Sequence, residues 1–123
     1  KSPIGTLDDT ENTTFLGAWN TVLEYLLTNY PCAKLGIIVP NGCTRPYTDA
    51  IRAVARRWGV PYLDLPGDYA VPLLNRVADK EEICERARAL RNEQFSVSEK
   101  NRHPNARAHE FESTIVEHWL RSL

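Results

Sequence analysis

Apolar side chains recur at helical spacing near the start of the chain. They stand at the first, fifth, eighth and twelfth positions of one stretch, namely Phe15, Trp19, Val22 and Leu26. This spacing places them on one face of a helix. Thr13 or Thr14 is a suitable N-cap, and Pro31 ends the pattern. The sequence therefore predicts a helix over about 14–29, after a loop over 1–12.

The same spacing returns in a second stretch, at Tyr47, Ile51, Val54 and Trp58. Gly59 follows where a glycine commonly ends a helix. A short apolar run lies on each side of this helix, "KLGIIVP" at 34–40 and "VPYLDL" at 60–65. Continuous runs with β-branched residues are typical of strands buried on both faces, as in parallel sheets. We therefore predict strand, helix and strand in this order.

A third helical pattern closes the chain, with Phe111, Ile115 and Trp119 or Leu120 on its buried face. Pro104 suits its first position, where a missing N–H costs nothing. The long connection over 66–102 contains "DKEEICERARALRNE", whose charge pairs indicate a short exposed helix. This helix is either part of a functional lid or a solvated element without a role.

The alternation of helices and strands predicts an α/β fold with a parallel sheet. In such sheets functional groups gather beyond the carboxyl ends of the strands, which here lead into "NGCTRP" and "PGDYAVP". Two strands are few for a sheet covered by helices on both sides. The chain thus has the pattern of the second half of a larger domain.

Composition narrows the choice of function. The 123 residues suffice for one domain, and a net charge of −1 gives no nucleic-acid footprint and no polybasic membrane anchor. The longest apolar runs are too short to span a bilayer. The sequence does not indicate a localisation. Its three cysteines, an odd number, favour free thiols over a disulfide framework.

The candidate chemistry centres on His103, which stands directly before Pro104 at the predicted helix start. An imidazole there is either a polar residue near a helix cap or a general base, since it titrates near neutrality. The spacing of His103 and His109 is not that of a helical metal pair, so we expect no metal site. No serine stands in a nucleophile motif. Cys43, just past the first strand, is the one suitably placed thiol, although such thiols are commonly inert.

Three stretches of the sequence resemble the C-terminal half of SGNH (GDSL-type) hydrolases, a family of esterases and acylhydrolases. "HPNARAHE" is similar to the last block of that family, in which His103 matches the catalytic histidine. "KLGIIVPNGCTRPYTDAIRAVARRWGVPYLDL" is similar to a late strand–helix–strand unit. "SPIGTLDDTENTTFLGAWNTVLEYLLTNYP" resembles the segment after the Gly-x-Asn-Asp block. The resemblance therefore covers nearly the whole chain, 1–123, as the C-terminal part of a single domain.

This resemblance implies a three-layer α/β/α, flavodoxin-like fold and hydrolysis of an ester by a serine, with His103 as base and then acid. It implies no metal or organic cofactor, and a small acyl ester or an acetylated carbohydrate as substrate. The family has an aspartate three residues before the histidine, where this sequence has Lys100. We therefore expect Glu99 or a backbone carbonyl to orient His103. In "GTLDD", Leu7 stands where the family has its asparagine, so that role is not carried over.

The nucleophile and oxyanion blocks of the family would precede Lys1, so we expect the chain alone to be inactive. We also expect it to need a partner, either an N-terminal half or a second copy, because a half-sheet has unpaired edge groups. The alternative is a non-catalytic α/β module for binding or assembly, and Lys100 at the aspartate position favours it. No nucleic-acid or membrane partner is expected.

Overall fold

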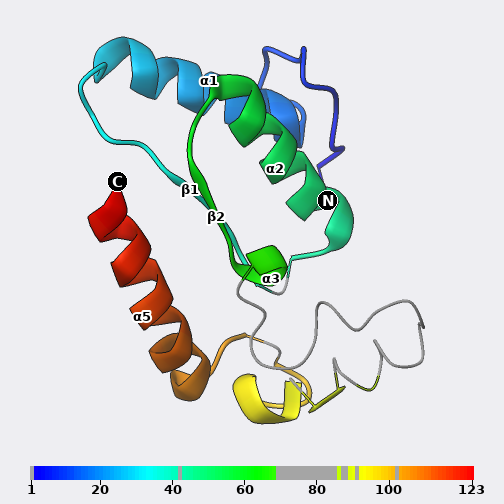
Figure 1. Cartoon of the computed structure of the whole chain (residues 1–123). Coiled ribbons are helices and arrows are strands. Elements are labelled where there is room, and N and C mark those ends of the chain that lie inside the picture. Colours follow the sequence, from blue (N-terminus) through cyan, green and yellow to red (C-terminus); the bar gives the residue numbers. More distant parts are fainter. Residues whose placement is uncertain (1, 42, 69–85, 87–88, 91, 102) are drawn as a thin grey trace. The chain divides into compact units, whose positions relative to one another are not determined.

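The computed structural model describes residues 2–41, 43–68, 86, 89–90, 92–101 and 103–123 (Figure 1). Its elements in chain order are α1 (Phe15–Asn29), β1 (Ile37–Val39), α2 (Arg45–Trp58), β2 (Tyr62–Asp64), α3 (Leu65–Asp68) and α5 (Ala106–Ser122). The two strands form a parallel two-stranded sheet, so the described residues mix helices and strands as an α/β domain does, but they show no three-layer, flavodoxin-like fold. The chain divides into two compact units, Lys1–Val39 with Cys43–Tyr62, and Pro40–Gly42 with Leu63–Leu123.

The first helix forms where the apolar spacing predicts one, although Val22 of the predicted apolar face is exposed and the buried residues are Leu16, Gly17, Asn20 and Leu23. Its N-cap is Thr14, whose hydroxyl oxygen accepts the N–H of Gly17 at 3.0 Å. This bond satisfies one of the backbone donors that a helix leaves unpaired at its start. The helix ends at Asn29, two residues before Pro31, so both predicted ends are confirmed.

The loop before α1 folds around the carboxylate of Asp9. This carboxylate accepts hydrogen bonds from the hydroxyl of Thr6 at 2.7 Å, the hydroxyl of Thr14 at 2.7 Å and the N–H of Thr6 at 3.0 Å. These three bonds, in which the Thr6 side chain counts most, lower the pKa of Asp9 below its ordinary value. Gly5 has a φ of +76°, and a Cβ there would overlap the Asp9 carboxylate. The "GTLDD" stretch is thus a tight structural turn.

The lowered pKa of Asp9 predicts a pH-dependent contribution to stability. Because the folded state holds the ionised carboxylate better than the unfolded chain, the contribution is present above the unfolded pKa, about 3.9 for aspartate. It is lost as the pH falls through the lower folded pKa. In thermal unfolding between pH 2 and 6, Asp9→Asn should therefore lower Tm near pH 6 and converge with the original chain at low pH.

Thr6→Ala is the matched partner of this experiment, because it removes the largest cause of the lowered pKa of Asp9. It should weaken the same pH dependence without abolishing it. If the difference in Tm between the original chain and Asp9→Asn is the same at every pH, ionisation of the Asp9 carboxylate does not contribute to stability.

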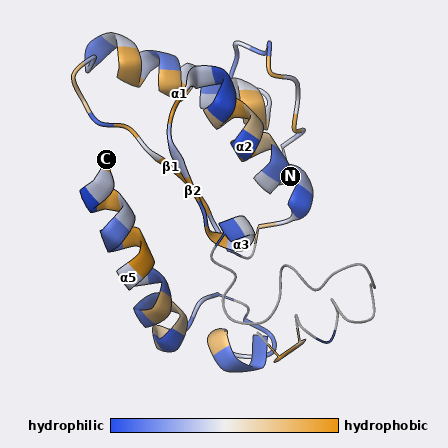
Figure 2. Cartoon of the chain, in the orientation of Figure 1, coloured by the Kyte–Doolittle hydropathy of each residue, from blue (hydrophilic) through white to orange (hydrophobic). Residues whose placement is uncertain are grey.

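One hydrophobic core lies within the first unit. In that unit α1 packs against α2, and α2 packs against β1, whose three residues are all hydrophobic (Figures 1 and 2). The buried residues of the core are Leu16, Leu23, Ile37, Val39, Ala50, Ile51, Val54, Ala55 and Val60. Gly59 ends α2 in the left-handed region, with φ at +65°, which confirms the predicted glycine cap.

The strands are shorter than the apolar runs that predict them. The runs over 34–40 and 60–65 become Ile37–Val39 and Tyr62–Asp64. Beyond the second strand, the Oδ1 of Asp64 accepts the N–H of Gly67 at 3.0 Å and caps the short helix α3, which the sequence does not predict. An aspartate followed by Pro66 is a helix-start signal that the strand pattern obscures.

The prediction that Pro104 takes the first position of the last helix is wrong. The N-cap is Asn105, whose Oδ1 accepts the N–H of Ala108 at 3.0 Å, and α5 begins at Ala106. Pro104 instead forms an antiparallel bridge with Ser96. Asparagine is among the strongest capping residues, so it determines the start of the helix in preference to the proline.

Much of the predicted helix in the connection over 66–102 lies outside the described residues. Within the described part, residues 86, 89–90 and 92–95 are helical, and Arg86, Ala89 and Leu90 are exposed. Cys84 also lies outside the described residues, whereas Cys32 and Cys43 are free thiols on the surface.

Candidate functional site

His103 lies on a loop that folds back on itself, here named the His103 loop and comprising residues 95–105, of which the structure describes all but residue 102. Antiparallel pairing closes this loop from its base to its tip. The pairs are Asn105 N–H to Phe95 C=O at 2.9 Å, the Ser96–Pro104 bridge, Val97 N–H to His103 C=O at 2.9 Å, and Ser98 N–H to Asn101 C=O at 3.0 Å. The histidine is therefore held in a hairpin-like turn and not on the helix.

The imidazole of His103 is exposed, while its backbone is fixed. The His103 N–H donates to the Oδ1 of Asn101 at 3.2 Å, and its carbonyl accepts from Val97. No described residue forms a hydrogen bond or an ion pair with the imidazole. Both ring nitrogens are thus open to a ligand or a reacting group, as a general base requires.

Glu99 stands at the tip of the same loop, four residues before His103, and is exposed. Neither a hydrogen bond nor an ion pair joins its carboxylate to His103 or to any other described residue. Lys100, at the position of the family's aspartate, is likewise exposed. The loop therefore brings Glu99 and His103 into one turn but does not pair them, and the orienting role of Glu99 stays a prediction.

The possible nucleophiles are not paired with a histidine among the residues that the structure describes. The hydroxyl of Ser96 donates to Asn92 Oδ1 at 3.5 Å, and that of Ser98 accepts the N–H of Asn101 at 3.0 Å. The hydroxyls of Ser113 and Ser122 donate to carbonyls of their own helix. Cys43 is an exposed free thiol in the other compact unit. None of these described serine hydroxyls, nor the Cys43 thiol, is hydrogen-bonded to a side chain that could act as a base and activate it.

Two asparagines of the second unit have contacts that sequence reasoning missed. Asn105 caps α5 and also bonds across the His103 loop. Asn41, two residues after β1, donates from Nδ2 to Glu112 Oε1 at 2.6 Å, and its Oδ1 is buried with no partner among the described residues. The available signals were the N-cap preference for asparagine and the position of Asn41 beyond a strand end.

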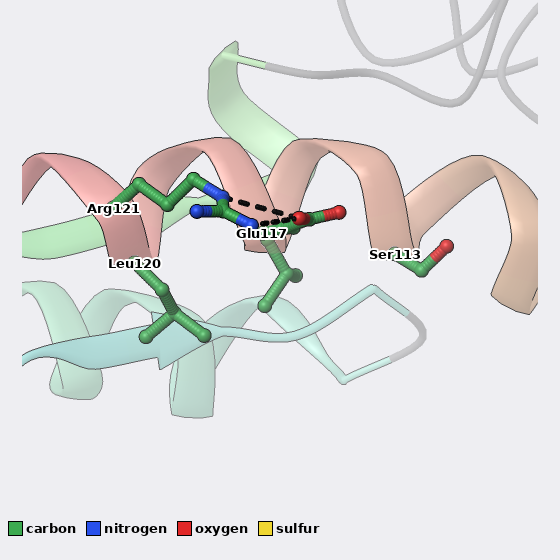
Figure 3. Close-up of a pocket in the computed structure, with 5 residues that line it drawn as sticks. Ser113, Glu117, Leu120 and Arg121 are labelled. Carbon is green, nitrogen blue, oxygen red and sulfur yellow. Dashed lines mark hydrogen bonds and ion pairs between the residues drawn. The ribbon is translucent and has the colours of Figure 1, made fainter.

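A shallow surface pocket runs along α5 and is shown in Figure 3. Its lining residues all belong to this one helix: Ser113, Val116, Glu117, Leu120 and Arg121. The Arg121 guanidinium donates to Glu117 Oε1, at 2.8 Å from Nη2 and 3.1 Å from Nε. Among the described residues only side chains of α5 line this pocket, and His103 is not one of them, so we do not assign the ester site to it.

The described residues contain no group of three or more histidine, cysteine, aspartate or glutamate side chains placed to hold a metal ion. None of the helices in the described part of the chain is both long and apolar enough to cross a membrane. Comparison with protein-family models, with curated proteins and with solved structures gave no match to this chain. The residues themselves therefore carry the functional argument.

Proposed function

We propose that the chain is the C-terminal portion of an SGNH-type ester hydrolase with a three-layer α/β/α fold, and that His103 is its general base. The observation that carries the proposal is the state of the imidazole, which is exposed and unpaired among the described residues while its backbone is fixed in a closed loop. The resemblance of "HPNARAHE" to the last block of the family supports the same role.

In the proposed reaction, His103 removes the proton from a serine hydroxyl as the oxygen attacks the ester carbonyl. His103 then gives the same proton to the leaving-group oxygen as the ester C–O bond breaks, so that the alcohol departs and the acyl group stays on the serine as an acyl-enzyme. In the second half of the reaction, His103 takes a proton from a water molecule as the water attacks the acyl carbonyl. It then returns this proton to the serine oxygen, which releases the acid and regenerates the serine. Because no described serine of this chain is paired with a histidine, we assign the nucleophile to a second polypeptide segment.

Glu99 is the proposed orienting carboxylate. Its side chain is exposed and forms no hydrogen bond or ion pair with another described residue, so it is available to turn toward His103. A carboxylate bonded to the imidazole N–H would fix the tautomer that accepts a proton. The proposed substrates are small acyl esters or acetylated carbohydrates. The proposed partner is an N-terminal half of the domain or a second copy of the chain.

The alternative proposal is a non-catalytic α/β module for binding or assembly. Two observations favour it, namely Lys100 at the position of the aspartate and the absence of a nucleophile paired with a histidine among the described residues. The sequence encoded upstream of Lys1 discriminates between the two. A Gly-Asp-Ser motif on a strand-to-helix turn supports the hydrolase, and its absence supports the module.

The 123-residue chain alone is expected to hydrolyse p-nitrophenyl acetate no faster than free imidazole does at the same concentration. The reason is that general base catalysis needs a nucleophile within hydrogen-bond reach. Release of p-nitrophenolate, followed at 405 nm for the original chain and His103→Ala, checks this. Saturable turnover that survives His103→Ala would contradict the role of His103 as the base. It would also contradict the proposal that the nucleophile lies on a second polypeptide segment.

A further inference from the structure

Asn105 has more hydrogen bonds than a helix cap needs. Its Oδ1 accepts the N–H of Ala108 at 3.0 Å, which is the capping bond. Its Nδ2 donates to the carbonyl oxygens of Gln94 at 3.0 Å and Ser96 at 3.1 Å. Its backbone N–H donates to the carbonyl of Phe95 at 2.9 Å. One residue therefore joins the start of α5 to three successive carbonyls at the base of the His103 loop.

These bonds determine where the His103 backbone lies. The carbonyls that Asn105 holds belong to the segment directly before Val97, and the Val97 N–H donates to the His103 carbonyl. Within the described part of the chain, the other bond of the His103 backbone is the one that its N–H donates to the Oδ1 of Asn101, at the tip of the same loop. Since the imidazole forms no hydrogen bond or ion pair with a described residue, its position depends on the closure of the loop.

We infer that Asn105 is a positioning residue for the His103 imidazole, through the two bonds donated by its amide. This inference rests on the proposed function, in which the imidazole acts on a hydroxyl. A base must lie within hydrogen-bond reach of the proton that it removes, and small displacements lower the rate steeply. Two of the three side-chain bonds of Asn105 stabilise the loop, and only the third stabilises the helix.

Contacts other than those of Asn105 also join the base of the loop to α5. A substitution at Asn105 can therefore be tested while the loop and the helix remain in contact. Arg107 donates from Nη1 to Gln94 Oε1 at 2.7 Å, and its guanidinium lies 5.5 Å from the ring centre of Phe95. The rings of Phe95 and Phe111 also contact each other, with centroids 6.4 Å apart. These contacts do not involve Asn105, so substitution at Asn105 leaves the base of the loop attached to α5.

The discriminating variant is Asn105→Ser. Serine caps helices about as well as asparagine but has no amide to donate to Gln94 and Ser96. Asn105→Asp is the second variant, which also keeps a capping oxygen and lacks the amide but adds a charge. An effect seen in both variants is therefore not due to the charge. Thr14→Ala, which removes the cap of α1 in the other unit, controls for a general loss of stability.

The measurement is NMR of the 123-residue chain. In both variants the Val97 amide should exchange with solvent about tenfold faster, since the loop opens more readily without the two bonds. The ring signal of His103 should shift or broaden, while that of His118, which lies toward the other end of α5, stays unchanged as an internal control. The Ala108 amide should remain protected. Unchanged Val97 exchange and an unchanged His103 signal in both variants would overturn the inference.

Kinetics then separate this inference from the proposed function. In a polypeptide extended upstream to include the nucleophile, Asn105→Ser should lower kcat about tenfold with KM unchanged, because the ring is misplaced but the substrate surface is intact. If His103→Ala abolishes turnover and Asn105→Ser leaves kcat unchanged, the positioning role is wrong and the proposed function stands. If the extended polypeptide has no esterase activity, both are overturned.

Discussion

If the proposed function holds, replacing His103 by alanine is expected to lower kcat/KM for ester hydrolysis by about a thousandfold in a polypeptide that joins this chain to the proposed nucleophile segment. A positioned general base contributes about 10²–10⁴ to the rate, and alanine has no group that can take the proton. The exposed imidazole makes no hydrogen bond or ion pair with a described residue, so its loss should leave the fold intact. Initial rates with p-nitrophenyl acetate, together with a melting curve, check both statements.

Two other exposed histidines give matched controls. His109 and His118 lie on α5 and, like His103, are exposed. Replacing either one by alanine should change kcat/KM by less than about twofold, because neither lies on the loop that holds the proposed base. A loss below about tenfold for His103→Ala, or an equal loss for His109→Ala, would contradict the assignment of the base.

The sequence predicted elements whose cause is local. The spacing of Phe15, Trp19, Val22 and Leu26, with Thr14 before it, is enough to define α1. Gly59 likewise ends α2 through its own left-handed backbone. A helix cap and an apolar face are formed by residues close together in the sequence. The ends and the position of such a helix can therefore be predicted from the sequence alone.

Features formed by contacts distant in sequence could not be predicted in the same way. The start of α5 is set by competition between Pro104 and Asn105. The capping bond from Ala108 to Asn105 favours the later start, while the bonds from Asn105 to Gln94 and Ser96 come from contacts across the loop. The pairing of Ser96 with Pro104 is not signalled by any apolar alternation. The sequence placed His103 in a connection outside the apolar faces, and this agrees with its exposure. Which side chain bonds to its imidazole depends on residues distant in the sequence, and the spacing of apolar residues does not indicate them.

The buried amide of Asn20 illustrates the same limit within the first unit. Asn20 lies on α1 with 8% of its surface exposed. It is not one of the apolar residues whose spacing predicts the helix, so its burial could not be predicted from that spacing. Its Nδ2 donates to the carbonyls of Leu7 at 2.9 Å and Asp9 at 2.8 Å. Its Oδ1 accepts the indole N–H of Trp58 at 2.7 Å. The N-terminal loop, α1 and α2 are therefore joined through one side chain.

Asn20→Ala should lower the free energy of unfolding by about 3 kcal/mol, because it leaves two carbonyls and one indole N–H without partners, at about 1–3 kcal/mol for each group that stays buried. Urea denaturation followed by circular dichroism measures this loss. Trp58→Phe removes the indole donor, and Asn20→Asp removes the amide donors while keeping the acceptor for Trp58. If the three bonds act as described, Asn20→Ala should cost less in the Trp58→Phe background than alone. A loss below about 1 kcal/mol for Asn20→Ala would show that water replaces the amide, and that the loop is held chiefly by the Asp9 turn.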